Sequence, residues 1–191
     1  MRTPTLIALL LFALSINAQT PAQVERQQAS DPAAIPQNIP ASNQDPAWRP
    51  SAAQQQSVLA VTNAYFKARD AGDAERAYEF LAARHKQMMP LEMYVGFIKQ
   101  FNEKAGALKV RSLKAMTWYK DTPQAGPGLY VAVDFSGCFE KLTVLRGYLI
   151  WHEQNDGSFL QVREDQTIVD NETMQRFNPA DQERVRAQLG C

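Results

Sequence analysis

The spacing of the apolar residues changes at Gly106, and this change constrains the fold more than any other feature of the sequence. Before Gly106, apolar residues recur every three or four positions, which is the period of a helix buried on one side. After it, apolar and polar residues alternate, which is the period of a strand with one buried face. Runs of helices followed by runs of strands are typical of an α+β fold.

Two helices are expected in quick succession at the start of this pattern. Ser51 and Gln54 have the spacing of a capping box, in which each side chain satisfies a backbone donor of the first helical turn. Gly72 fits the left-handed position that ends the first helix, and Asp73 fits the cap of the second. The second helix is predicted to end near His85.

A third helix is predicted from Pro90 to Gly106, followed by about four antiparallel strands. Two out-of-phase apolar runs in the first strand predict a bulge at 111–112. The Asn-Asp-Gly sequence at 155–157 predicts a hairpin between the last two strands, and a terminal helix begins near Pro179. We therefore expect an α+β domain with three N-terminal helices packed on a curved antiparallel sheet of about four strands, plus a C-terminal helix.

The first 18 residues have the features of a secretory signal peptide. Arg2 supplies the positive charge, residues 6–14 form an unbroken apolar run, and small residues precede a cleavage position after Ala18. A membrane anchor is the alternative, but the run has only about half of the ~20 apolar residues that span a bilayer. The mature protein is therefore expected in the periplasm or secreted, with no membrane association after cleavage.

Residues 19–50 are predicted to be a disordered tail rich in Pro, Gln and Ala, because so few apolar side chains cannot offset the entropy of ordering. Trp48 is the aromatic residue of this segment, and it either docks on the folded part or stays free. Residues 51–191, about 140 in number, have the size of one domain with one core.

The charge balance argues against nucleic acid as a partner. The chain has 20 basic and 20 acidic residues, and loss of Arg2 with the signal peptide leaves 19 against 20, a net charge of −1. The basic residues are scattered, whereas a nucleic-acid-binding protein concentrates them on one face.

Several segments resemble known families. The stretch YFKARDAGDAERAYEFLAARH resembles the opening of nuclear transport factor 2-like (cystatin-like) domains, in which a helix, a Gly-Asp break and a short helix recur. Three further segments are similar to an exported bacterial family of unknown function: EKAGALKVRSLKAMTWY, GPGLYVAVDFSGCFEKLTV and NDGSFLQV. The likeness covers residues 58–165 and implies a fold and a compartment, because none of its motifs is catalytic. Phe159 stands where that family has Trp, and its closing Gly-Tyr is absent.

In such a fold a ligand pocket lies between helices and sheet, and catalysis there requires an acid or a His directed into an apolar cavity. Asp134 alternates with apolar neighbours and is predicted to point away from their face. Glu164 shares a phase with Leu160 and Val162, so it faces either inward or into solvent at the strand end. No residue is assigned as catalytic. The candidates for lining a pocket are Tyr65, Tyr78, Tyr94, Phe101, Glu164 and His152.

No metal or cofactor site is expected. Two histidines and two cysteines occur, and none of their spacings is that of a metal site; a phosphate-binding loop and a nucleophile motif are also lacking. Because an exported protein meets oxidising conditions, Cys138 and Cys191 are instead predicted to form a disulfide.

Four consecutive apolar residues, Tyr148 to Trp151, predict a strand covered on both sides. The second cover is expected to be the terminal helix, anchored by Val185 and Leu189, or the same surface of another copy in a homodimer.

These observations favour a non-catalytic periplasmic domain that binds a protein partner or a small apolar ligand. One alternative is an inhibitor or immunity-type protein that blocks a partner enzyme. Another is an isomerase- or dehydratase-like enzyme that uses an acid in the pocket between helices and sheet. The enzyme alternative would require an acid inside that cavity. Nothing in the sequence selects the inhibitor alternative.

Overall fold

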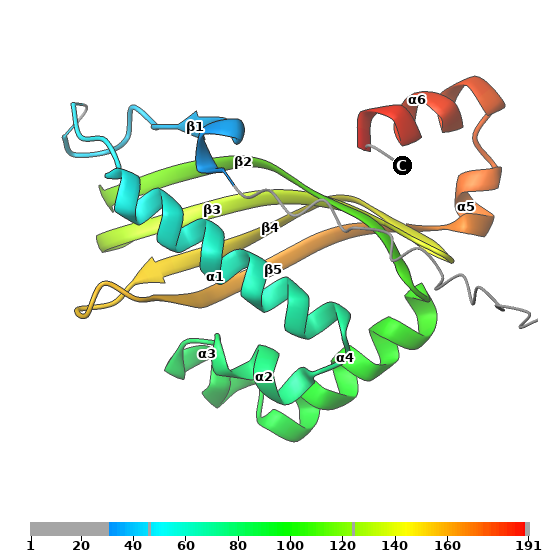
Figure 1. The fold of residues 1–191 in the computed structure, drawn as a ribbon, viewed down its shortest axis with the longest axis horizontal. Helices are drawn as coiled ribbons and strands as arrows, with labels where there is room; N and C mark the ends of the chain where they lie inside the picture. The colour runs from blue at the N-terminus through cyan, green and yellow to red at the C-terminus, as the bar shows by residue number, and fades with distance from the viewer. Residues whose placement is uncertain (1–30, 46, 124, 190–191) are drawn as a thin grey trace, which may run out of the picture.

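The computed structural model describes residues 31–45, 47–123 and 125–189, and this part of the chain is an α+β domain (Figure 1). Its sheet has five strands in the order β1-β2-β3-β4-β5. The predicted signal peptide and residues 19–30 lie outside the described residues. No helix in the described part is long and apolar enough to cross a membrane.

Residues 31–45 and 47–50 are structured, so the prediction of a disordered tail is wrong for these residues. A 3-10 turn, η1 (Pro32–Ala34), precedes strand β1 (Gln37–Asn38), which runs parallel to β2. The side chain of Asn43 is buried, and it donates to the carbonyl of Trp118 at 3.1 Å and accepts from the amide of Lys120 at 3.1 Å. The docking alternative for Trp48 is confirmed by its ring contact with Trp118, at 6.3 Å between centroids. These contacts with the distant strand β2 offset the entropy cost of ordering a segment of polar composition.

The first helix, α1 (Ala52–Asp70), begins with the predicted capping box at Ser51 and Gln54. Gly72 adopts a φ of 78°, and the side chain of Asp73 caps the next helix, α2 (Ala74–Glu79). The predicted break between the first two helices is therefore confirmed.

The predicted second helix is two short helices, α2 and α3 (Ala83–Met88). Between them, Leu81 forms a bridge with Gln161 of the sheet, and the amide of Ala82 donates to the Gln161 carbonyl at 2.8 Å. The helix is interrupted there because backbone groups that would form hydrogen bonds within a continuous helix instead bond to the sheet.

Helix α4 (Leu91–Ala105) corresponds to the predicted third helix and ends at Gly106 with a φ of 70°. Its buried residues recur every three or four positions, at Tyr94, Ile98, Phe101 and Ala105, whereas Leu91 at its start is 40% exposed.

Four long antiparallel strands form the rest of the sheet: β2 (Leu108–Thr122), β3 (Gly126–Phe139), β4 (Leu142–Glu153) and β5 (Phe159–Asp170). The predicted hairpin joins β4 and β5, and its Gly157 has a φ of 79°. The predicted bulge at 111–112 is misplaced. The register instead shifts on either side of it, between Leu108 and Val110 and between Leu113 and Ala115.

Helix α1 lies across one face of the sheet and buries the core there (Figure 1). The ring of Phe66 meets that of Phe135 at 4.9 Å, and Tyr65 meets Trp151 at 6.0 Å between centroids. Phe135 also covers Gly147 so closely that a Cβ there would overlap its ring. We call the face of the sheet that meets α1 the inner face and the opposite one the outer face.

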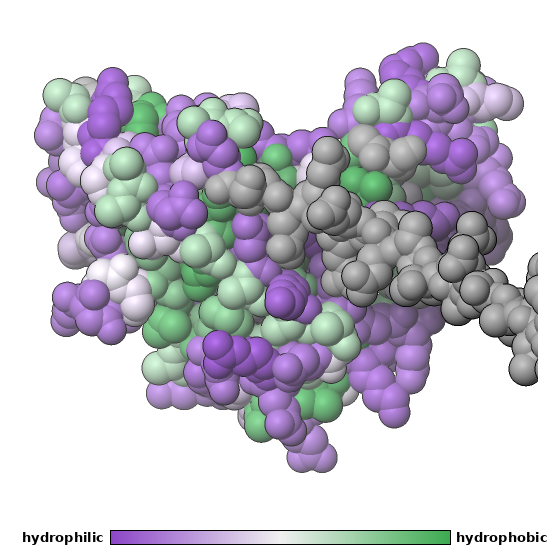
Figure 2. All heavy atoms as spheres, viewed as in Figure 1, coloured by the Kyte–Doolittle hydropathy of each residue, from purple (hydrophilic) through white to green (hydrophobic). Residues whose placement is uncertain are grey.

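Two helices follow the sheet: α5 (Asn171–Gln175), which the sequence did not predict, and α6 (Pro179–Leu189), which begins as predicted. Both are covered mainly by hydrophilic side chains, whereas apolar ones show between α1 and α2–α3 (Figure 2). The end of α6 is fixed to β2, where Ser112 and Lys114 donate to the carbonyls of Leu189 and Gln188 at 3.5 and 3.3 Å.

The terminal helix does not cover Tyr148, so that part of the prediction is wrong. Trp151 is fully buried on the inner face, but Tyr148 and Ile150 are half-exposed and line a groove on the outer face. The order of the strands explains this, because α6 contacts β2 at Ser112 and Lys114, and β3 lies between β2 and β4. The homodimer alternative stays a prediction.

No cysteine is free among the described residues, which include Cys138 near the end of β3. Cys191 lies outside the described residues, so the pairing of the two cysteines stays a prediction.

Candidate functional site

A buried polar network on the inner face brings together three of the six residues predicted to line a pocket. The hydroxyl of Tyr65 donates to Oε2 of Glu164 at 2.5 Å and lies 3.2 Å from the hydroxyl of Tyr94. Arg69 forms an ion pair with Oε1 of Glu164, and the side-chain amide of Gln161 donates to Oε2 at 3.1 Å. We call these five residues the Glu164 network.

Helix α1 and strand β5 position the charged pair. Tyr65 and Arg69 are four residues apart on α1 and so share its sheet-facing side. On β5 the register shifts, so that Gln161 opposes Trp151 while Arg163 opposes Ile150. The extra residue, Val162, leaves both Gln161 and Glu164 on the inner face.

The inward alternative for Glu164 is therefore the observed one, but the predicted phase is wrong. Leu160 opposes His152 on the outer face, and Val162 lines the groove on that face together with Ile150. Glu164 lies on the opposite face from both because the register shift separates them.

The network holds its protons at neutral pH. Burial raises the pKa of Tyr65 well above its usual value and that of Tyr94 to about 12, so both phenols stay protonated. Burial by itself lowers the pKa of Arg69, but Glu164, Tyr65, Asp70 and Tyr94 together outweigh burial and raise it, with Glu164 contributing the largest part of the rise. Burial lowers the pKa of His85, which the charge of Glu164 opposes.

The carboxylate of Glu164 is fully engaged. It accepts from Tyr65, Arg69 and Gln161, and the side chain of Arg69 is only 1% exposed. A buried guanidinium requires such a counter-charge, because an unpaired buried cation is strongly destabilising. This arrangement is that of a structural ion pair, since a general acid or base needs a proton that it can exchange with a substrate.

The other predicted pocket residues are distributed around the network or away from it. The ring of Tyr78 lies 5.5 Å from that of Tyr94, and its hydroxyl donates to the carbonyl of Met89 at 3.0 Å. Phe101 supports Arg69, whose guanidinium carbon lies 4.7 Å from the ring centroid. His152 does not join them; it lies on the outer face, stacked on Tyr130 at 4.2 Å.

A second buried ion pair, between Asp70 and Arg111, was missed by the sequence reasoning. The guanidinium of Arg111 donates to both oxygens of Asp70, at 2.6 and 3.1 Å, and lies over the ring of Phe66 at 3.9 Å. A signal for Arg69 was available, because a charged residue one turn after Tyr65 falls on the apolar side of α1. Arg111 lies between the first two register shifts of β2, where the alternation of apolar residues does not predict which face a side chain points to.

The outer face carries a groove of about 910 Å³, larger than the other hollows described below. We call it the outer groove. Among its lining residues are three tyrosines, three arginines and one acid: Tyr119, Tyr130, Tyr148, Arg84, Arg146, Arg163 and Asp134. Asp134 thus points away from the helices, as predicted from its phase.

The outer groove carries an excess of positive charge. Arg163 pairs with Asp165 at 3.4 Å, whereas Arg84 and Arg146 form no ion pair with any described residue. Three cations face one acid inside the groove. In the described part of the chain, no three His, Cys, Asp or Glu side chains are grouped so as to hold a metal ion.

The raised pKa values of Tyr65 and Tyr94 predict a loss of stability at alkaline pH. In the unfolded chain both phenols ionise near pH 10, while in the folded chain they stay neutral to a higher pH. Their contribution to the free energy of unfolding is therefore fully present below about pH 10. It is lost as the pH rises through the pKa of the folded state, which is about 12 for Tyr94.

Phenolate absorbance of the folded and urea-unfolded protein measures this difference directly. We expect two of the six tyrosines to titrate late in the folded chain, and a Tyr94→Phe variant to lose one of the late steps. If all six titrate near pH 10 in the folded protein, the description of the network is wrong.

Comparisons with known proteins give one match. Neither a search of curated proteins nor a search of solved structures found a match. The family described as protein of unknown function (DUF4019) matches residues 61–162, which lie within the 58–165 stretch that resembles such a family. The match runs from α1 to the first residues of β5 and so covers the inner face, apart from Glu164, and most of the outer groove. Because the match spans more than half of the sequence, this chain belongs to that family of unknown function.

Proposed function

We propose that this protein is a non-catalytic exported domain that binds a protein partner through the outer groove. The observation that carries the proposal is the composition of the groove, in which tyrosines and arginines surround half-exposed apolar residues such as Ile150. Tyr and Arg are enriched at protein interfaces and in the residues that dominate their binding energy.

The Glu164 network supports a non-catalytic role. A small apolar ligand or a substrate of an isomerase- or dehydratase-like enzyme would have to enter between α1 and the sheet and meet an available acid. Glu164 is engaged by three donors there, and the hydroxyls of Tyr65 and Tyr94 satisfy each other. A ligand in that place would have to break a buried ion pair, which is costly.

The charge of the outer groove supports an acidic partner over a second copy of this chain. In a symmetric homodimer through the groove, Arg84 and Arg146 would face the same cations of the other copy. A partner with Asp or Glu side chains would instead pair with both arginines. An inhibitor or immunity-type role uses the same surface and differs only in that the partner is an enzyme.

The proposed compartment and fold family rest on the sequence together with this architecture. The N-terminal signal sequence supports export to the periplasm or secretion, with cleavage after Ala18. A long helix, a Gly-Asp break and short helices laid on an antiparallel sheet support a nuclear transport factor 2-like fold.

A charge reversal in the outer groove tests the proposed function. Arg146→Glu should weaken binding of a partner captured from periplasmic extract, and then purified, by at least about tenfold, since a charge-assisted contact becomes repulsive. The matched control is Arg176→Glu on α5, an exposed arginine paired with Glu172 outside the groove. Equal binding by both variants, or copurification of a small molecule with no protein partner, would contradict the proposal.

We further propose that Cys138 pairs with Cys191 and that this bond ties the end of α6 to the sheet. The contacts of Leu189 and Gln188 with β2 support it, because they bring the helix end to the strand that pairs with Cys138 at Val110. On the chain-entropy model, closing the loop between Cys138 and Cys191 stabilises the fold by about 4 kcal/mol.

Thiol titration of the unreduced, denatured protein tests the pairing. No free thiol is expected, and reduction should lower the free energy of unfolding by a few kcal/mol. A Cys138→Ala variant should lose the same stability and expose one thiol. Two free thiols in the unreduced chain would refute the pairing.

A further inference from the structure

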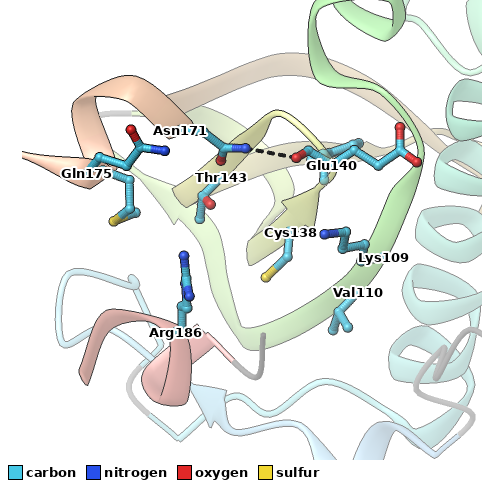
Figure 3. A pocket seen from close by; sticks show the side chains of 10 residues that line it. Lys109, Val110, Cys138, Glu140, Thr143, Asn171, Gln175 and Arg186 are labelled. Carbon is cyan, nitrogen blue, oxygen red and sulfur yellow. Dashed lines mark hydrogen bonds between the residues drawn. The ribbon is translucent and has the colours of Figure 1, made fainter. Parts of the chain in front are cut away.

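A second hollow, of about 340 Å³, lies between helices α5 and α6 and the ends of β2, β3 and β4 (Figure 3). We call it the α5–α6 pocket. It is separate from the outer groove, since the described residues lining the two do not overlap. Its size is at the lower end of small-molecule sites, which range from about 300 to 1,000 Å³.

Two cations enter this pocket from different elements. Figure 3 shows Arg186 of α6 and Lys109 of β2 extending into it from different sides. Neither forms an ion pair with a described residue, whereas Arg184, two positions before Arg186 on the same helix, pairs with Asp181 at 2.9 Å. The two charges are therefore available to a ligand.

The acid among the described lining residues does not neutralise them. The carboxylate of Glu140 turns away from the pocket and accepts from the amide of Ala107 at 3.0 Å (Figure 3). Its main-chain carbonyl accepts from the side-chain amide of Asn171 at 2.8 Å, which fixes the pocket wall. Among the described residues, no acid therefore pairs with either cation.

The remaining wall combines donors with apolar surface. Thr143 and Gln175 contribute a hydroxyl and an amide, while Val110 and the buried Met174 contribute apolar surface. Polar groups of this kind orient a ligand, and apolar ones accommodate its carbon skeleton.

We propose that the α5–α6 pocket binds a small organic dianion, one acidic group on Arg186 and the other on Lys109. Arg favours planar carboxylates, which its two parallel N–H groups can bind together, and Lys contributes a compact charge for the second group. A linear dicarboxylate of about four carbons fits a cavity of this volume. This site is independent of the proposed protein partner, so either proposal can fail without the other.

Calorimetric titration of the full mature chain with succinate tests the proposal. Binding with a dissociation constant on the order of 1 mM or tighter is expected, as is weakening by added salt because the contacts are ionic. Butyrate, which has the same length and one carboxylate, should bind at least about tenfold more weakly. Inorganic phosphate serves as a second probe, and binding tighter than that of succinate would overturn the dicarboxylate assignment.

Single substitutions locate the site. Arg186→Gln and Lys109→Gln should each weaken succinate binding by at least about tenfold, and both side chains are exposed, so the fold should tolerate the change. Arg184→Gln on the same helix is the matched control and should bind as the parent does. Unchanged binding in both pocket variants, equal loss in the control, or no binding of succinate at 10 mM (about the weakest meaningful affinity) would overturn the proposal.

Discussion

The burial of Arg69 beneath the sheet is the constraint on which the inner face depends. A guanidinium that is almost fully removed from water needs a carboxylate and further hydrogen bonds, because its desolvation is otherwise uncompensated. Glu164 supplies the carboxylate, and its position requires the register shift in β5. Tyr65 and Tyr94 then complete the polar contacts around it. Helices α1 and α4 and the sheet are thus joined by one network as well as by apolar packing.

The two faces of the sheet therefore have different chemistry. On the inner face the buried charges are paired, Arg69 with Glu164 and Arg111 with Asp70, and the buried tyrosines hold their protons. On the outer face two arginines of the groove, Arg84 and Arg146, form no ion pair with a described residue, and tyrosine side chains line the groove. A polar group that is already paired contributes to stability, whereas an unpaired one on a concave surface can bind something else. This contrast directs the proposed function to the outer face.

The sequence predicts α1, α4, α6 and the four long strands because each is set by local signals. The capping box at Ser51, the Gly72 break and the hairpin at Gly157 all depend on residues a few positions apart. The errors arise where distant segments decide. The split of the second helix depends on Leu81 pairing with Gln161, and the order in residues 31–45 depends on Asn43 bonding to β2.

The candidate site shows the same division. Tyr65 and Tyr94 are predictable because helical spacing places them on buried stripes. Glu164 could not be placed by its phase, since the register shift at Val162 separates it from the residues used to assign that phase. His152 lies in a strand that is apolar on both faces, so alternation gave no direction, and its outward position follows from its pairing with Tyr130.

The stability of Glu164 and Arg69 variants tests most directly whether this pair is structural. The account predicts that Glu164→Gln lowers the free energy of unfolding by about 3–5 kcal/mol, because it leaves a buried guanidinium without its counter-charge. Replacing both partners, as Arg69→Met with Glu164→Leu, should recover most of that loss, since apolar groups of similar volume need no counter-charge. Urea unfolding measures both. A Glu164→Gln variant within about 1 kcal/mol of the parent would contradict the account and reopen Glu164 as a functional acid.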